Sequence, residues 1–320
     1  MEIFKHDSNI QFLRWRRISI VISTLLVLGS IFAIATRGLN YALDFTGGIL
    51  VEAKYERPVD IKDVRSALSA AGFDHAVVQS VGGAREVSIR LQAESGKTDD
   101  SQAEKKRSDQ VAGDVLKALK ATRSDVTKTR TDFVGPQVGK ELKSNGVTAV
   151  IFVILGIMIY IGLRFEWRFA IAAIASEFHD TLITVGFYAL TFREFDITVL
   201  ASVLAVVGYS INDKVVVFDR VRELFRSTRK GDPEDILNRA INSTLSRTII
   251  TAAFTGVTMV ALFFIGGPAV HGFALTMIIG IVIGTLSSIF FANPILLWLG
   301  VSKKDLMPVT RDNAELMRRP

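Results

Sequence analysis

Several ionisable side chains lie within long apolar stretches of the sequence, where a charge is costly and is therefore usually paired or functional. They are Glu177, His179 and Asp180 in one stretch, Asp213 and Lys214 in a second, and Arg247 at the start of a third. A carboxyl group in such a place can exchange a proton, and a nearby guanidinium changes how readily it does so. Asp213 and Arg247 are therefore candidates for a proton relay. Glu177, His179 and Asp180 are further candidates for the same relay.

Each of these residues also has a purely structural interpretation. Asp213 and Arg247 could form a buried salt bridge that only fixes two helices to each other. His179 could serve only to hydrogen-bond a neighbour. Lys214 is long enough to extend its ammonium group to the lipid headgroups, so we interpret this residue as structural.

The apolar stretches are long enough to cross a bilayer as helices, which takes about 20 residues each. Apolar residues make up 49% of the 320 residues and charged residues only 22%, an unusual balance for a soluble protein. We predict a polytopic α-helical membrane protein with six transmembrane helices, at about 18–36, 146–163, 169–192, 197–218, 248–265 and 271–299. The resulting regions are a first helix with the N-terminus (1–37), an outer domain (38–143), a five-helix region (144–300) and a tail (301–320).

Basic residues beside the predicted helices indicate how the chain crosses the membrane, because short loops rich in Lys and Arg stay in the cytoplasm. The loops and termini on one side contain Arg14, Arg16, Arg17, Arg164, Arg168, Arg220, Arg222, Arg226, Arg229, Lys230, Lys303, Lys304, Arg318 and Arg319. The short loops on the other side contain only Arg193. We therefore predict that both termini are cytoplasmic and that residues 38–143 lie outside. The net charge of +6 is explained by this orientation, and we expect no nucleic-acid partner.

Residues 38–143 have the pattern of a small soluble domain. Apolar residues alternate between Ile49 and Tyr55, as in a half-buried strand, and a helical pattern then runs through 59–71 and stops at Gly72. We predict further strands at 76–81 and 86–91, a loop at 94–102, a helix around 111–119 and a strand at 126–134. The order strand, helix, strand, strand, helix, strand predicts an α+β, ferredoxin-like domain between the first and second transmembrane helices.

Motifs of soluble enzymes are missing from the sequence. The absence of cysteine excludes disulfides and thiolate metal sites. Residues 135–140 resemble a phosphate loop, but this segment is one residue short and lacks the Ser or Thr that would reach magnesium. We interpret it as a turn and linker. There is also no HExxH motif, so we expect no metal, no cofactor and no enzymatic activity.

Three further patterns concern helix packing. Small residues at intervals of four, which let helix backbones approach closely, predict a packing seam in the sixth span. They are Gly272, Thr276, Gly280, Gly284 and Ser288. A polar stripe that we expect to face protein follows the fifth span, at Thr244, Arg247, Thr251, Thr255 and Thr258. Residues 232–246 predict an amphipathic helix on the membrane surface, leading into the fifth span.

Several segments together resemble the SecF family, whose members are partners of SecD in bacterial Sec protein export. The segments run in order through nearly the whole chain: Asp44-Phe45-Thr46-Gly47-Gly48, Val134-Gly135-Pro136-Gln137-Val138-Gly139, His179-Asp180, Gly208-Tyr209-Ser210-Ile211-Asn212-Asp213, Val216-Val217-Phe218-Asp219-Arg220 and Ser243-Thr244-Leu245-Ser246-Arg247-Thr248. One such segment would be a weak signal, whereas all of them in order, with this topology, are specific.

The resemblance implies the six-helix half of a resistance-nodulation-division-type assembly in the bacterial inner membrane, with SecD as the other half. It implies a place beside the SecYEG channel, with YajC as a further partner. Proton flow would there assist the export of unfolded polypeptide on the periplasmic side. In that family the residues that match Asp213 and Arg247 belong to the proton path. Lys214 stands where a small polar residue is expected, so the electrostatics around Asp213 are in question.

The resemblance also assigns the glycine-containing motifs that flank the outer domain to a hinge in the periplasm. The residues concerned are Asp44, Gly47, Gly48, Gly135 and Pro136.

Two other classes of function remain open. One is a half-transporter of the same superfamily that exports lipids or small molecules, although such proteins usually join both halves in one chain. The other is a passive scaffold of the translocase without ion flux. A charge-neutral substitution of Asp213 separates the scaffold from the proton-driven subunit, since a scaffold should tolerate it.

Overall fold

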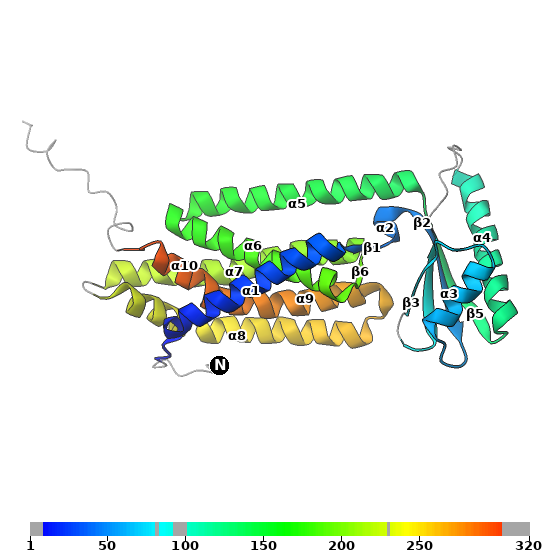
Figure 1. Cartoon of the computed structure of the whole chain (residues 1–320). Helices are drawn as coiled ribbons and strands as arrows, with labels where there is room; N and C mark the ends of the chain where they lie inside the picture. The colour runs from blue at the N-terminus through cyan, green and yellow to red at the C-terminus, as the bar shows by residue number, and fades with distance from the viewer. Residues whose placement is uncertain (1–8, 81–82, 92–100, 229–230, 303–320) are drawn as a thin grey trace, which may run out of the picture. The chain divides into compact units, whose positions relative to one another are not determined.

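The computed structural model describes residues 9–80, 83–91, 101–228 and 231–302 (Figure 1). The chain divides into two compact units. One comprises residues 40–149 and 194–197 and contains the sheets, and the other comprises the remaining parts of the chain and is helical.

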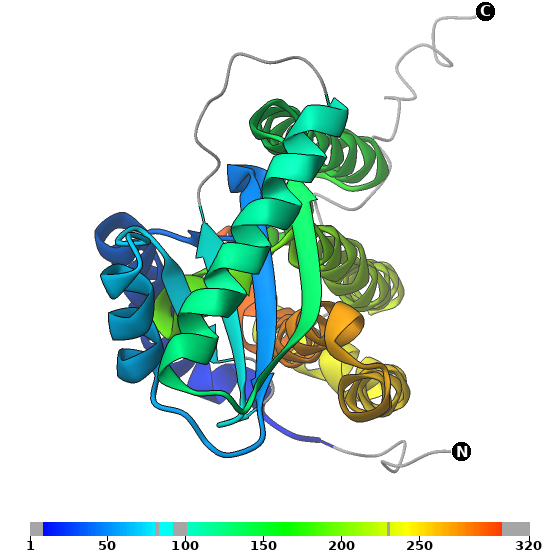
Figure 2. The ribbon, with the colours of Figure 1, turned by 90° about the vertical axis from the view of Figure 1, so that its right-hand side faces the viewer.

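The larger sheet has four strands in the order β3-β4-β2-β5, and every neighbouring pair is antiparallel. The elements of this part are β2 (Gly48–Tyr55), α3 (Ile61–Ala70), β3 (Val77–Ser80), β4 (Glu86–Leu91), α4 (Ser101–Thr122) and β5 (Val126–Val134). They follow the order predicted from the sequence. Val51 of β2 is fully buried in a core that includes Leu68 of α3 and Val115 of α4. Figure 2 looks onto α4, which crosses the strands.

Local sequence signals explain the limits of these elements. Asp60 caps the start of α3, because its side chain accepts a hydrogen bond from the backbone N–H of Lys62 (2.9 Å). Gly72 follows the helix with a positive φ of 87°, which a glycine adopts at no steric cost. The loop predicted at 94–102 lies mostly outside the described residues, and α4 begins at Ser101.

The same unit contains a second sheet, which has two strands. β1 (Asn40–Tyr41) pairs in parallel with β6 (Glu194–Phe195), and the one-turn helix α2 (Leu43–Thr46) follows β1. Arg90 of β4 contacts this second sheet. It forms an ion pair with Glu194 and donates a hydrogen bond to the Tyr41 carbonyl. Segments that lie about half the chain apart in sequence are therefore joined here.

The helical unit consists mainly of long helices, although residues 136–149, the first half of α5, belong to the sheet-containing unit. They are α1 (Arg16–Arg37), α5 (Pro136–Arg164), α6 (Trp167–Thr191), α7 (Ile197–Ser227), α8 (Pro233–Ile265), α9 (Pro268–Ser287) and α10 (Asn293–Trp298), with a 3-10 turn η1 (Phe12–Trp15) and a π-helical turn η2 (Ser288–Ala292). α1 packs on α6, and α9 packs on α6 and α8. The sixth predicted span is thus interrupted by one π-helical turn between α9 and α10.

Five helical segments of the described residues are long and apolar enough to cross a membrane: 12–37, 136–164, 197–227, 233–265 and 269–298. The protein is therefore a helical membrane protein. α6 coincides with the third predicted span and has 25 residues, so its length would suffice. It does not reach the apolar character of the other five, because Glu177, His179 and Asp180 lie in its middle.

The start of α5 differs from the prediction. Residues 135–140 were expected to form a turn and linker, but α5 begins at Pro136. Proline is favoured at the first position of a helix because its missing N–H would have no helical partner there. The backbone N–H of Gly139 already donates to the Gly135 carbonyl (3.0 Å). The helix therefore starts about ten residues before the predicted span.

The predicted amphipathic helix at 232–246 is the first part of α8, which continues without interruption to Ile265. Its apolar stripe does not lie on a surface. Ile236, Leu237 and Ile241 are buried in a core shared with Phe169 of α6 and Val221 of α7. The stripe has the periodicity of a surface helix, but tertiary packing covers it.

The N-terminal segment is held against the same part of α8 by two amide side chains one turn apart. Asn238 accepts a hydrogen bond from the Leu13 N–H (3.1 Å) and donates to Gln11 Oε1 (2.9 Å). Asn242 accepts from the Ile10 N–H (3.1 Å) and donates to its carbonyl (2.9 Å). Leu13 is fully buried as a result.

Candidate functional site: a buried ionic cluster between α6, α7 and α9

Polar residues at helical spacing place one face of α6 opposite one face of α7. Glu177, Asp180 and Thr184 share a face of α6 because they are three and four residues apart, and Ser210 and Lys214 share a face of α7 for the same reason. Asp180, Ser210 and Lys214 are all fully buried. The sequence could therefore indicate both faces, but not that they meet.

Lys214 forms the centre of the cluster. Its Nζ donates hydrogen bonds to Glu177 Oε2 (2.9 Å), Asp180 Oδ2 (2.7 Å) and Ser210 Oγ (2.6 Å). The prediction that Lys214 extends to the headgroups is therefore wrong. Two buried carboxylates attract the ammonium group more strongly than the distant headgroup region does, and they also satisfy its donors.

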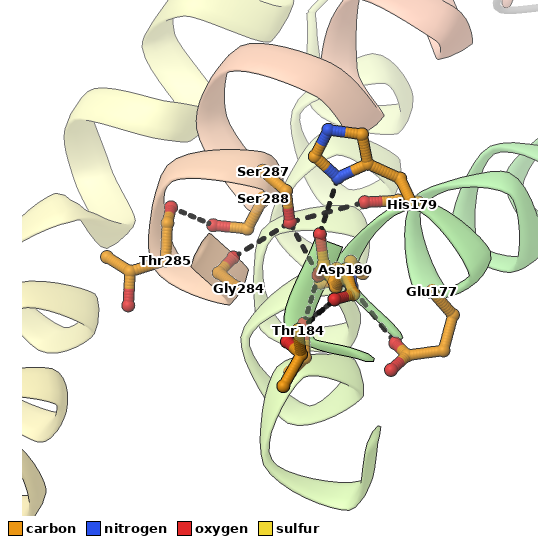
Figure 3. A network of polar contacts seen from close by, with 11 residues as sticks. Glu177, His179, Asp180, Thr184, Gly284, Thr285, Ser287 and Ser288 are labelled. Atoms are coloured by element: carbon orange, nitrogen blue, oxygen red, sulfur yellow. Dashed lines mark hydrogen bonds and ion pairs between the residues drawn. The ribbon is translucent and has the colours of Figure 1, made fainter. Parts of the chain in front are cut away.

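Asp180 has hydrogen bonds to both oxygens of its carboxylate. Oδ1 accepts from His179 Nδ1 (2.8 Å), and Oδ2 accepts from Ser210 Oγ (2.5 Å) and Ser287 Oγ (2.7 Å) in addition to Lys214. Figure 3 shows Asp180 in contact with both His179 and Ser287. Helices α6, α7 and α9 therefore converge on this one side chain.

His179 lies at the edge of the cluster. Its ring stacks on Phe291, with 4.2 Å between ring centroids. Because an ionised carboxylate only accepts hydrogen bonds, Nδ1 donates to Asp180. Nε2 is buried and has no partner among the described residues. Ser287 and His179 also line a largely apolar cavity of about 430 Å³ between α1, α6 and α9.

Asp213 lies beside Lys214 in the sequence but outside its hydrogen-bond network. It is only 4% exposed, and its Oδ2 has no hydrogen-bond partner in the described part of the chain. Within 9–80, 83–91, 101–228 and 231–302 no ion pair joins Asp213 to Arg247. Arg247 is exposed on α8. The structure therefore brings Glu177, His179 and Asp180 together with Lys214 and does not pair Asp213 with Arg247 in the described part of the chain.

The polar stripe of α8 is mostly uncovered by this chain. Thr244 is buried, but Thr251 and Thr255 are only half-buried, and Arg247 and Thr258 are exposed. Thr251 and Thr258 donate their hydroxyl hydrogens to carbonyls of their own helix. A stripe that was expected to face protein thus lies on an outer surface of the isolated chain.

The small residues of α9 lie close to α7 and α6. A Cβ atom on Gly280 would overlap the side chain of Val206, and one on Gly284 would lie 2.7 Å from Ser210 Oγ. The Gly272 carbonyl accepts hydrogen bonds from Tyr188 of α6 (3.2 Å) and from Thr276 (2.8 Å). The close approach at Gly284 allows Ser210 and Ser287 to bind the same carboxylate.

The two glycine-containing motifs contact each other through their backbones within the sheet-containing unit. A Cβ atom on Gly47 would lie 2.8 Å from Pro136 Cα, and one on Gly139 would lie 2.8 Å from the Gly47 nitrogen. Gly47 also has a positive φ of 66°, which favours glycine. Gly48 begins β2, and Gly135 precedes α5. Asp44 accepts a hydrogen bond from the Ile197 N–H (3.1 Å).

Sequence reasoning missed two partners in the cluster, Ser210 and Ser287, and the inward orientation of Lys214. Ser287 stands one residue from the predicted seam position Ser288, and nothing in the seam pattern favours it. Among the described residues no group of three His, Asp or Glu side chains is arranged to hold a metal ion. Glu177 and Asp180 instead share one ammonium group, that of Lys214, whose single positive charge balances only one ionised carboxylate.

The fold and site define a class: a helical membrane protein with a buried ammonium–carboxylate cluster and a separate sheet-containing unit. The family pattern described as protein export membrane protein SecD/SecF, C-terminal, matches residues 114–302. The SecD/SecF GG motif matches residues 32–59.

Relatives of known name match nine tenths or more of the chain. The protein translocase subunit SecF of Vibrio alginolyticus is 42% identical over 100% of this chain and 99% of its own. SecF of Pseudomonas aeruginosa is 44% identical over 90% of each chain. This chain belongs to the SecF family of protein translocase subunits.

A solved structure of similar fold supports the same assignment. It is the crystal structure of SecDF, a translocon-associated membrane protein, from Thermus thermophilus, with a TM-score of 0.80 and 33% identity. The match covers 93% of this chain but only 39% of that chain. This chain therefore spans about two fifths of the SecDF protein.

Proposed function

We propose that this chain is an auxiliary subunit of the Sec translocase that uses the proton-motive force, together with a SecD-like partner, to assist export across the inner membrane. Membership of the SecF family supports the translocase role. The observation that carries the proton step is the contrast between two buried carboxylates. Asp180 is fully hydrogen-bonded, whereas Asp213 has a buried oxygen without a partner among the described residues.

That contrast assigns different roles to the two aspartates. Asp180 is fixed by Lys214 and two serines, so a proton would have to displace hydrogen bonds that hold three helices together. Asp213 has no such constraint. A guanidinium that approaches or leaves a carboxylate changes its affinity for protons. Movement of α7 relative to α8 would change the distance from Asp213 to Arg247 and thereby couple protonation to helix movement.

The available energy limits how this coupling works. A proton that crosses the membrane down its gradient releases about 2.3 kcal/mol of free energy for each 100 mV of membrane potential. Export of a long polypeptide would then need repeated small cycles. Arg247 keeps its charge throughout and acts only by its position.

A SecD-like protein is the partner that this chain needs. Arg247 is exposed on α8, and a charged side chain left uncovered in hydrocarbon costs several kcal/mol. The remaining length of the matched SecDF chain corresponds to such a partner. SecYEG, YajC and the exported polypeptide follow as further partners from the family relationship.

The architecture that we propose has six spans, with α6 as the sixth member because its charged centre is shielded by α1, α7 and α9. The sheet unit is ferredoxin-like, which the order β3-β4-β2-β5 supports. It lies in the periplasm between the first and second spans, at about 38–143, and both termini are cytoplasmic.

Substitution of Asp213 tests the proposal. Asp213→Asn keeps the size of the side chain and removes its titration, and it should abolish the stimulation of export by a proton gradient in membrane vesicles. Asp219→Asn, six residues further along α7 at an exposed ion pair with Arg164, is the matched control and should keep that stimulation. Arg247→Met should impair the same step. Full gradient dependence in the Asp213→Asn vesicles would show that Asp213 is structural, as in a passive scaffold.

A further inference from the structure

The environment of Lys214 Nζ has the composition of a binding site for a monovalent cation. Three oxygen atoms surround the nitrogen at 2.6–2.9 Å, two of them from the carboxylates of Glu177 and Asp180 and one from the Ser210 hydroxyl. Hard cations prefer such oxygen ligands. Ser287 lies beside this position and donates a hydrogen bond to the Asp180 oxygen that also contacts Lys214.

The position is closed to water, and the ammonium group occupies it fully. Lys214 and Asp180 are fully buried, and Glu177 is 8% exposed. An ammonium group has three donors, and all three are used. Glu177 Oε1 is buried without a partner among the described residues, so the position still offers an unused ligand atom.

We infer that this position is a monovalent-cation site whose permanent occupant is the ammonium group of Lys214, and that Lys214 thereby determines ion specificity. The ammonium group is tethered to α7 and cannot exchange with the solution. Free Na⁺ or K⁺ is therefore excluded from Glu177 and Asp180, and exchange is left to Asp213. This consequence for exchange rests on the proposed function, whereas the cation site itself does not.

A plain structural salt bridge is the competing explanation, and both explanations predict that loss of Lys214 destabilises the protein. An unpaired buried carboxylate costs several kcal/mol. They differ in what restores stability. Only a cation site accepts a small free cation in place of the lost ammonium group, and only a cation small enough to enter.

The test compares the thermal unfolding of purified full-length protein in NaCl, KCl, methylammonium chloride and choline chloride at equal ionic strength. The Tm of the wild type should be the same in all four salts. Lys214→Ala should have a lowered Tm in choline chloride and a saturable recovery of several degrees in at least one small cation. Lys214→Met fills the space with an apolar chain and should not recover. Adding Asp180→Asn to Lys214→Ala should remove the recovery.

Two results would overturn the inference. One is a Lys214→Ala protein whose Tm does not depend on the identity of the cation. The other is failure of both Lys214→Ala and Lys214→Ser to fold in any of the small cations, because a cation site should then have been filled. Neither result depends on export, so they are separate from the outcome for Asp213.

Discussion

The carboxylate of Asp44 accepts a hydrogen bond from the backbone N–H of Ile197, at 3.1 Å. Ile197 is the first residue of α7, whose first N–H groups have no partner within the helix. A negative charge is also favourable at this end of the helix dipole. The aspartate of the Asp44–Gly48 motif therefore acts as a capping side chain on the first N–H of a helix that begins 153 residues later.

Loss of this cap should destabilise the protein. Asp44→Ala should lower the free energy of unfolding by about 1 kcal/mol, the typical cost of removing a capping side chain. Asp44→Asn keeps an acceptor oxygen and should lose less. Asp109→Ala removes an exposed carboxylate on α4 and should have no effect. Denaturant unfolding of the three variants measures the difference, and equal values for Asp44→Ala and Asp109→Ala would exclude a capping role.

The contact between α9 and α7 predicts a position-specific effect of adding one methyl group. Gly280→Ala would place a Cβ atom in the side chain of Val206 and should cost about 1–3 kcal/mol, as for other overpacked interiors. A Cβ atom added to Gly256 would meet no other atom within 4 Å, so Gly256→Ala should be neutral or stabilising. Thermal unfolding and co-purification with the SecD-like partner are the measurements. If both variants behave alike, the close approach at Gly280 is unimportant.

Glu52, in the middle of β2, predicts a dependence of stability on pH. Burial raises the pKa of its carboxyl group, with Arg130 opposing this effect. A carboxyl group with a raised pKa in the folded state contributes stability at pH values below its unfolded pKa of about 4.3, and this contribution is lost as the pH rises through the folded value. Glu52→Gln should therefore raise the Tm of the sheet unit at neutral pH but not at pH 3.

A fragment of residues 48–134 suits this measurement, because it contains all four strands of the larger sheet and both helices. It should unfold cooperatively and give a mixed α/β circular dichroism spectrum. A disordered spectrum would contradict an independent domain. An equal Tm of the wild-type and Glu52→Gln fragments at neutral pH would show that burial of Glu52 has no energetic cost.

The distribution of basic residues predicts the orientation of the chain, which cysteine labelling can measure. The protein contains no cysteine, so single cysteines have no background. Ser95→Cys should react with a membrane-impermeant reagent from the periplasmic side and Ser227→Cys from the cytoplasmic side. Reaction of both from the same side would refute the proposed topology.

Local patterns in the sequence were sufficient for most of the elements. The period of two in β2 and the apolar runs of the long helices predicted their type and position, because these signals depend on neighbouring residues alone. β5 has the predicted limits, 126–134. The start of α5 was missed because proline favours turns and first helical positions alike.

The sequence also marked the ionisable residues of the apolar helices as candidates, since any charge in an apolar helix is conspicuous. It could not determine how they are paired. Lys214 is 34 and 37 residues from its carboxylate partners, and Ser287 is 107 residues from Asp180. Residues so far apart in the sequence come into contact only because α6, α7 and α9 approach closely. Gly280 and Gly284 permit this approach. Residue types are local information, whereas a pairing is a property of packed helices, and only the tertiary structure decides it.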